Sequence, residues 1–569
     1  MSRRWVTATR TGMVLAGLLW ACTSSGGNVL VTRPDTAGDT ATDSNTDRDS
    51  DSSPPDTGVD YRSPLGMLPV GISDWSTAWP LIDLMKQSRE WTDWVSGDTG
   101  PVTVDDRGWV TSLSEGQTAG TVFLANDDGP ALFNRVLVRY DGSGTISYHW
   151  SAVKVEEASA PGADVVEVST GNHLLQIDAT DPADYLRNIS IVPEPLVPDF
   201  DNGETFTPVW LDRMKEVGVL RFANWTGPMD VGAPRWADRP LQTDRSWTVS
   251  GFPWTAAIDL CNRLQVHPWI NVPLLADDNY VRELATAFRD TLDPSLVVLV
   301  EHADRIWDPQ MRRQPEAEAE SFALLGDAPD ALLQWHAAQT AAICDIFKTV
   351  VFADAPHRVR CVLSLPEDAT AAAETALACP DFVAQESGRV PCAEHGFDVL
   401  AISAAFDGCL GDEAHMDQIR PWFADSDGGL TRGMEQLADG RHLSGCTGDV
   451  ASREAVYRGF AELAADRGLS LYAFEGGQHV TAVGTPLQED PDVIAFHLAL
   501  NRDGRMRDRY LEHFDVWQRA GGRLFVHFGD AGIPGKYGSW GALESIVQDT
   551  SPKWEALMEF AATPIWWSD

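Results

Sequence analysis

The chain has 569 residues, of which 43 are Lys or Arg and 84 are Asp or Glu, so its formal net charge is −41 and its pI is near 4.5. A chain this acidic is repelled by nucleic acid and by anionic lipid, which excludes both as expected partners and leaves a neutral polymer as the better fit. The balance of 22 Trp against 9 Tyr favours carbohydrate, because sugar rings stack on flat aromatic faces.

The N-terminus has the pattern of an export signal. Basic residues at positions 3 and 4 precede an apolar stretch over 13–20, and the sequence LWAC at 19–22 resembles a bacterial lipobox, whose cysteine is lipidated. We therefore expect residues 1–22 to be a lipoprotein signal peptide ending in Cys22, with an ordinary signal peptide as the alternative. The apolar stretch is too short to span a bilayer, so we expect membrane contact through the lipid anchor only.

Residues 23–60 consist mostly of Asp, Thr, Ser, Gly and Pro. Such a composition cannot bury enough apolar surface to fold, so it predicts a disordered acidic linker. Its acidic repeats lack the Gly and the terminal Glu of a calcium-binding EF-hand loop. Signal and linker together predict an exported bacterial lipoprotein at the outer membrane or cell surface.

The folded part begins with one βα unit, after which the sequence pattern changes from βα to all-β. Residues 61–96 contain a predicted strand at 68–75 and a predicted helix at 79–88. Residues 97–193 carry short alternating runs broken by Gly, Asp and Pro, without a helical period, which predicts an inserted all-β sandwich. We expect this insert to give structural support, with a role as a sugar-binding accessory as the alternative.

Apolar strand runs alternate with amphipathic helical stretches through residues 194–569. This alternation predicts βα units around a parallel sheet. With the first unit it gives eight strands, so the predicted fold class is α/β, a (β/α)₈ TIM barrel with the sandwich inserted after its first βα unit. The strands predicted in this region are 218–223, 267–272, 296–301, 359–364, 398–403, 469–474 and 523–528.

The cysteines suggest two disulfides and no metal site. Cys379 and Cys392 flank a polar loop, as do Cys409 and Cys446, so both pairs are predicted to be disulfides in an exported protein. No C-x-x-C or histidine spacing indicates zinc, and no cofactor is expected. The remaining cysteines lie in apolar patterns and are expected to be free and buried: Cys261, Cys344 and Cys361.

Several motifs, among them VLRFANW, VEHADRIWD and YAFEGGQH, resemble a family of bacterial exported proteins often labelled cellulose-binding proteins. The resemblance extends over nearly the whole chain after the linker. It implies a barrel like that of the clan A glycoside hydrolases. Retaining enzymes of that kind need two facing carboxyl groups about 5–5.5 Å apart, one a nucleophile and one a proton donor.

The resemblance also implies site residues. Glu475 in FEGGQH stands at the nucleophile position. The family's fourth strand ends in V-E-Y-S-N-E-V-W-N, so Asp304 takes the Asn slot and Arg305 takes the slot of the acid/base Glu. A guanidinium cannot donate a proton near neutral pH. Two further strand-end positions, His and Tyr in the family, are Leu274 and Ala405 here.

We expect Arg305 to lie across the cleft from Glu475, to lower the pKa of that carboxyl group and to pair with it. His302 and Asp304 are candidates for a displaced proton donor. Strand alternation points both away from the side of Arg305, so Asp304 faces the cleft only if the strand ends or bulges.

Other residues near the barrel mouth are candidates for contacts with sugar. The indoles are expected to form a platform, and three polar side chains to bind hydroxyl groups. Deeper in the barrel, Glu301 is expected to pair with Arg221 in a structural role. The candidates are Trp225, Trp307, Trp540, Asn224, His479 and Lys536.

The sequence thus favours a cell-surface polysaccharide-binding protein whose hydrolytic activity is weak or lost. Its partner would be a neutral polysaccharide or oligosaccharide. One alternative is an active retaining glycoside hydrolase with Glu475 as nucleophile and His302 or Asp304 as donor. A second is a non-catalytic structural surface lipoprotein.

Overall fold

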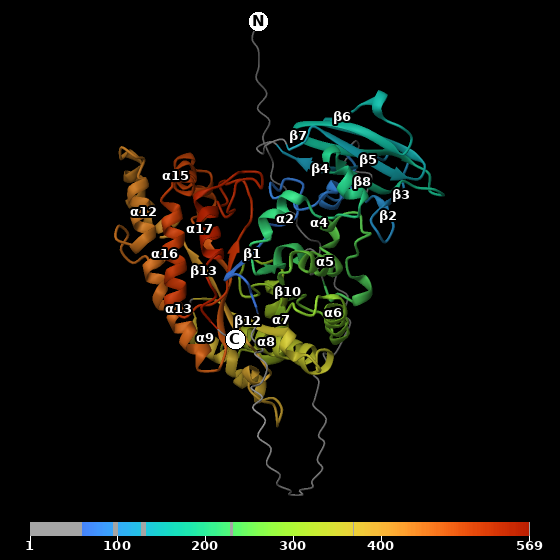
Figure 1. The fold of residues 1–569 in the computed structure, drawn as a ribbon. Coiled ribbons are helices and arrows are strands. Elements are labelled where there is room, and N and C mark those ends of the chain that lie inside the picture. Colours follow the sequence, from blue (N-terminus) through green and yellow to red (C-terminus); the bar gives the residue numbers. More distant parts are fainter. Residues whose placement is uncertain (1–59, 95–100, 127–131, 228–231, 368, 568–569) are drawn as a thin grey trace, which may run out of the picture. The chain divides into compact units, whose positions relative to one another are not determined.

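The computed structural model describes residues 60–94, 101–126, 132–227, 232–367 and 369–567 (Figure 1). Eight parallel strands close into a barrel in the order β1-β15-β14-β13-β12-β11-β10-β9. The predicted (β/α)₈ barrel is therefore confirmed, and each of the seven later strands overlaps its predicted position. Their bounds are β1 Leu65–Leu68, β9 Val219–Arg221, β10 His267–Val272, β11 Val298–His302, β12 Val359–Ser364, β13 Val399–Phe406, β14 Ser470–Gln478 and β15 Phe525–Phe528.

The proposed signal peptide, Cys22 and nearly all of the linker lie outside the described residues. Among the described residues, no helix has both the length and the apolar character needed to cross a membrane.

Helices connect the barrel strands and pack on the outer side of the sheet, where α8 contacts β11 and β12 and α13 contacts β13 and β14. The longer helices are α5 Trp254–Leu264, α6 Asp278–Thr291, α7 Gln314–Leu325, α8 Ala331–Cys344, α9 Thr370–Ala378, α12 Leu430–Asp439, α13 Val450–Ala465, α15 Pro491–Arg502, α16 Met506–Arg519 and α17 Pro552–Ala561. Short ones are α1 Val197–Asp201, α2 Pro208–Met214, α3 Ala223–Thr226, α4 Trp247–Ser250, α10 Pro380–Val383, α11 Met416–Ile419 and α14 Thr485–Gln488.

Two features of the sequence explain these elements. Strand β10 (HPWINV) is buried at all six positions, as expected for a parallel strand covered on both faces. Several helices begin at a side-chain cap: Asp277 accepts from the backbone N–H of Tyr280 before α6, and Asp449 accepts from that of Ser452 before α13. Such caps satisfy N–H groups that the helix leaves without a partner.

The first βα unit differs from the prediction. Its strand is Leu65–Leu68, not 68–75, and the predicted helix at 79–88 is a 3₁₀ helix, η1, confined to Leu84–Gln87. Asp83 explains the short helix, because its carboxylate accepts from the N–H of Met85 and also from that of Ile191 in the insert. This segment contacts both the insert and the short helix α4 of the barrel.

The insert is all-β, but the described strands do not confirm a two-sheet sandwich. They form one five-stranded antiparallel sheet and a separate two-stranded sheet. The segment around η1 packs on β4 and β8 and shares their apolar core, so it covers the sheet where a second sheet was expected. The five strands are β4 Ala119–Ala125, β5 Arg135–Asp141, β6 Gly144–Lys154, β7 Ala163–Thr180 and β8 Arg187–Pro193, and the pair is β2 Thr103–Val104 with β3 Val110–Ser112.

The structure contains three disulfides among the described residues. Cys379 is bonded to Cys392 and Cys409 to Cys446, the two pairs predicted from the sequence. A third joins Cys344 to Cys361, so the expectation that these two are free is wrong. The end of α8 and the middle of β12 lie side by side, with Cα atoms 5.8 Å apart, which the sequence does not reveal. Cys261 is free and buried, as expected.

Candidate functional site

Glu475 lies near the C-terminal end of β14 and is turned toward the barrel interior by a bulge. Tyr472 pairs with Ala401, and both belong to the apolar cluster inside the barrel. The register then shifts between Ile402 and Ser403, so that Ser403 pairs with Glu475. Strict alternation after Tyr472 would point position 475 outward, and the extra residue of the bulge returns it to the inner face.

Two glycines after Glu475 allow β14 to pack closely against its neighbours. A Cβ atom on Gly476 would lie 2.4 Å from the carbonyl oxygen of Ala404 and 2.4 Å from the ring of Phe525. Gly477 has a φ of 118°, a conformation that favours glycine. The Gly-Gly pair is therefore explained by backbone packing at the mouth.

Arg305 reaches Glu475 from the loop that follows β11. This strand ends at His302, and both Ala303 (φ 51°) and Arg305 (φ 41°) adopt left-handed conformations that are uncommon outside glycine. Nη1 of Arg305 lies 3.0 Å from Oε1 of Glu475 and 4.0 Å from Oδ2 of Asp308. The side chains of the Arg305–Glu475 pair are 27% and 13% exposed, so water reaches the pair only in part.

Burial dominates the titration of Glu475. Burial raises the pKa of this carboxyl group, and the lowering by Arg305 does not compensate. Arg305 thus lowers the pKa of Glu475 as expected, but burial outweighs it and the net shift is upward. Burial lowers the pKa of Arg305, but Glu475 and Asp304 outweigh it and hold that pKa above its usual value. The guanidinium stays charged and supplies no proton for catalysis.

A second ion-pair network lies beneath this pair. Nη2 of Arg221 on β9 donates to Oε2 of Glu301 at 2.9 Å and to Oδ1 of Asp304 at 2.7 Å. Glu301 also accepts from Nε1 of Trp269 at 2.8 Å and from the hydroxyl of Ser364. The predicted pairing of Arg221 with Glu301 inside the barrel is confirmed, and both side chains are fully buried.

Asp304 could face the cleft only if β11 ended or bulged before it. The strand does end before Asp304, and the carboxylate turns inward to Arg221. Its Oδ2 lies 3.6 Å from Nε of Arg305. Burial raises the pKa of Asp304, but Arg221 and Arg305 outweigh burial and place that pKa below its usual value. Asp304 is thus held ionised, which suits an acceptor of hydrogen bonds and not a proton donor.

His302 does not reach the site. Its Nδ1 lies 3.0 Å from Nδ1 of His336 on α8, and its Nε2 lies 3.1 Å from the carbonyl oxygen of Leu274. It is packed between the strand and the outer helix, as strand alternation predicts. Burial lowers the pKa of His302 to about 4. A buried, neutral ring outside the barrel cannot serve as a displaced donor for chemistry at Glu475.

The two slots that hold His and Tyr in the resembling family are apolar here. Leu274 is buried in a cluster with Ala303 and Trp335 beside the end of β10. Ala405 lies on β13, where it pairs with Gly477. Neither side chain can hold a sugar hydroxyl or a catalytic carboxylate.

Trp225 and Asn224 do not line a sugar platform. Trp225 is 2% exposed, its Nε1 donates to the carbonyl oxygen of Val70 at 2.7 Å, and its ring centroid lies 4.8 Å from that of Phe252. Nδ2 of Asn224 donates to the carbonyl oxygen of Pro69 at 2.9 Å. The expectation for Trp225 is wrong because this residue lies within a turn of helix, α3, and its indole is buried in the core.

The remaining candidates lie at or near the surface. Trp307 is partly buried against the interior cluster. His479 is exposed, and its ring centroid lies 5.8 Å from that of Trp540. Lys536 forms an ion pair with Glu489. Trp307, Trp540 and His479 therefore remain available to line the mouth.

Sequence reasoning missed buried polar atoms near the pair. Nη1 of Arg221, Nε of Arg305 and Oδ1 of Asn271 are buried and have no hydrogen-bond partner within the described part of the chain. The signal for Asn271 was its position in HPWINV, an otherwise apolar strand that ends at the mouth. Buried polar groups are normally satisfied, so these three atoms are exceptions close to the Arg305–Glu475 pair.

No protein-family model matches the chain, and no curated protein matches it. Similar solved structures include the GH51 arabinofuranosidase from Xanthomonas axonopodis pv. citri, at 13% identity and a TM-score of 0.35, covering 62% of this chain and 65% of that enzyme. A family 5 xyloglucanase from Paenibacillus pabuli has 10% identity and a TM-score of 0.36, covering 63% and 91%. A GH10 endoxylanase from a sugarcane soil metagenome has 12% identity and a TM-score of 0.34, covering 61% and 91%.

These likenesses are to glycoside hydrolases, but their TM-scores are low. The assignment of the barrel rests on the strand pairing of this chain.

Proposed function

We propose that the protein is an exported lipoprotein that binds neutral polysaccharide at the cell surface through a glycoside-hydrolase-like barrel, with hydrolysis weak or lost. The ion pair between Arg305 and Glu475 carries this proposal. A retaining hydrolase needs a second carboxyl group facing the nucleophile, about 5–5.5 Å away. The group that faces Glu475 here is a guanidinium, which holds the carboxylate instead of protonating a leaving group.

The same geometry supports binding. The mouth carries the guanidinium of Arg305 and the carboxylates of Asp304, Asp308 and Glu475, all of which can bind hydroxyl groups. Buried polar atoms of Arg305 and Asn271 without a protein partner add to this set. Trp307 and Trp540 supply aromatic surface nearby. A neutral sugar suits the site, because the strongly acidic chain repels anionic polymers.

The second candidate function is an active hydrolase in which Asp304 is the proton donor. Its inward position favours this role, but its lowered pKa opposes it, because a donor must be protonated at working pH. The two functions differ in cleavage rather than in binding.

Migration of the protein through native gels that contain soluble xylan, glucomannan or hydroxyethylcellulose tests the binding. We expect at least one neutral polymer to retard the wild-type protein. Arg305→Ala combined with Glu475→Ala should weaken this retardation, because it removes polar groups that bind the polymer at the mouth. Absence of retardation in every polymer would instead favour a structural surface lipoprotein. Reducing ends released from the polymer that binds, assayed in parallel, separate binding from hydrolysis.

A further inference from the structure

Among the described residues, the most exposed indoles lie on the insert and on the segment that precedes it, residues 61–96. Among the tryptophans of the described residues, only Trp75, Trp94 and Trp150 have large exposed fractions, at 60%, 45% and 54%. Each belongs to one surface, because Arg89 lies over the ring of Trp75 and lines a cavity together with Trp94 and Trp150. Exposed aromatic groups that cluster mark a binding surface more often than single ones do.

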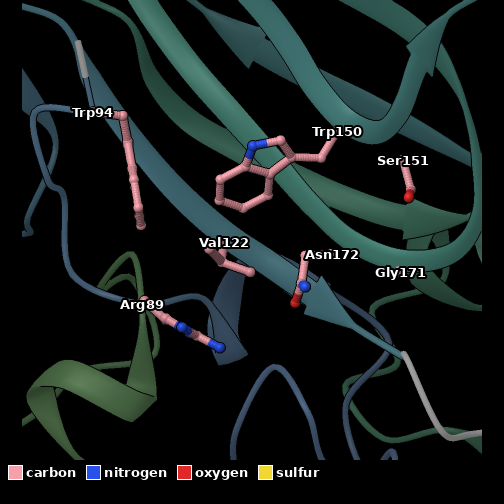
Figure 2. Close-up of a pocket in the computed structure, with 7 residues that line it drawn as sticks. All are labelled: Arg89, Trp94, Val122, Trp150, Ser151, Gly171 and Asn172. Carbon is pink, nitrogen blue, oxygen red and sulfur yellow. The ribbon is translucent and has the colours of Figure 1, made fainter. Parts of the chain in front are cut away.

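The cavity on this surface has a volume of about 510 Å³, within the usual range for small-molecule sites. The rings of Trp94 and Trp150 stand nearly perpendicular, at 85°, with centroids 5.4 Å apart. Figure 2 shows one indole edge-on and the other face-on, with Asn172 and Ser151 beside them. The two rings therefore form an aromatic corner bordered by polar side chains.

The backbone holds both indoles in place. Trp150 adopts a left-handed conformation with φ 65°, at a register shift between β6 and β7. A bulky residue rarely takes that conformation, and such outliers concentrate at functional sites. Trp94 packs over Gly120 on β4, where an added Cβ would lie 2.3 Å from the indole Cδ1. The absence of a side chain at position 120 makes room for the ring.

The polar groups at the cavity are also held in position. Arg89 donates from Nε to Oδ1 of Asp74 at 2.9 Å and from Nη2 to Oδ2 at 2.8 Å, and Asp74 is buried. The charge of Arg89 is thereby neutralised, while 45% of its side chain stays exposed. Ser151 donates its hydroxyl to the carbonyl oxygen of Thr170, which leaves the Ser151 oxygen able to accept.

We propose that this cavity on the insert binds a neutral pyranose unit of a polysaccharide, as a second sugar site distinct from the barrel mouth. The apolar C–H face of an equatorially substituted pyranose stacks on an indole. Its hydroxyl groups would meet Arg89, Ser151 and Asn172. The neutralised arginine and the acidic chain disfavour an anionic sugar. This gives the insert a binding role in place of the structural role expected from its sequence.

Retardation of the full-length protein in gels containing xylan, glucomannan or hydroxyethylcellulose tests this proposal, with polygalacturonate as the anionic comparison. Trp94→Ala and Trp150→Ala should each raise the apparent dissociation constant for a neutral polymer by about tenfold. Gly120→Ala should weaken binding as well, because the new methyl group displaces Trp94. Val153→Ala, which changes another exposed apolar residue of β6, should leave retardation unchanged.

Each outcome bears on the proposal. Unchanged retardation in Trp94→Ala and Trp150→Ala, in protein whose thermal unfolding matches the wild type, overturns it, as does retardation by polygalacturonate alone. Loss of binding in the Arg305→Ala, Glu475→Ala double variant but not in Trp150→Ala overturns the insert site and leaves the barrel function standing. Loss of binding in Trp150→Ala but not in the double variant supports the insert site and contradicts binding at the barrel mouth. If no neutral polymer retards the wild-type protein, both proposals fail.

Discussion

Arg305 lies on the loop after β11 and Glu475 on β14, which β12 and β13 separate from β11 in the barrel, and they meet at 3.0 Å between Nη1 and Oε1. Two local irregularities bring them together. A bulge between β13 and β14 turns Glu475 inward, and left-handed residues after β11 turn Arg305 toward it.

Replacing Arg305 with Glu should raise hydrolysis of a neutral polysaccharide. The change removes the cation from Glu475 and supplies a second carboxyl group, whose pKa should rise beside the like charge. A missing general acid costs about 10²–10⁴-fold in rate, and we expect only about tenfold of this to return, because Leu274 and Ala405 remain. The release of reducing ends from the polysaccharide measures this gain in hydrolysis. Arg305→Gln is the control, and equal gains in both variants would show that removing the cation, not adding an acid, is responsible.

With a glycoside that has an activated aryl leaving group, the pH dependence of kcat/KM should report the titration of Glu475. Such a leaving group needs no proton, so slow turnover requires only ionised Glu475. Burial raises the pKa of Glu475 and Arg305 lowers it. Arg305→Met removes a lowering influence, so the rate should begin to fall at a higher pH in this variant as the solution is acidified. An acidic limb that stays in place, or moves to lower pH, contradicts this account of the pair.

Arg221→Met should lower the free energy of unfolding by about 3–5 kcal/mol, because it leaves Glu301 buried without its cation. Chemical denaturation measures the loss. The matched control is Arg502→Met, which removes a cation from an exposed pair with Glu544 and should cost less than about 1 kcal/mol. Equal losses in the two variants would mean that the buried network has no special role in stability.

Cys22→Ser should move the protein from the membrane to the soluble fraction of the producing cells. The expectation rests on the lipobox-like sequence LWAC and on the polar linker that follows it. Fractionation followed by immunoblotting measures the distribution. Cys261→Ser, which changes a buried free cysteine, is the control. Wild-type partitioning of the Cys22→Ser protein would show that this residue does not carry an anchor.

The barrel could be predicted from the sequence because buried parallel strands are continuous apolar runs. Strand β10 and the predicted run 267–272 coincide. The first strand was misplaced because 68–75 also contains apolar residues, while the barrel uses only Leu65–Leu68. The predicted sandwich is not confirmed, since alternation within single strands does not show what covers their sheet.

The site was predictable only in part. Similarity of VEHADRIWD and YAFEGGQH to a known family placed Arg305 opposite Glu475, but the net pKa shift of Glu475 depends on burial, which the sequence does not state. The inward turn of Asp304 depends on left-handed conformations at non-glycine residues, which carry no sequence signal. The position of Trp225 after a strand suggested a sugar contact, but position alone gives no information on burial, and Trp225 is buried. Trp94 and Trp150 carry no sequence signal of a site, because neither follows a predicted barrel strand and the sequence does not show that they meet.

The most direct test of the central claim is the release of reducing ends by wild-type protein from the neutral polysaccharide that retards it. We predict no release above that of Glu475→Gln, because Arg305 occupies the position of the proton donor and pairs with the carboxylate. Release at an ordinary enzymatic rate that Glu475→Gln abolishes would contradict the account. Asp304 would then become the leading candidate for the donor, and the protein would be a hydrolase.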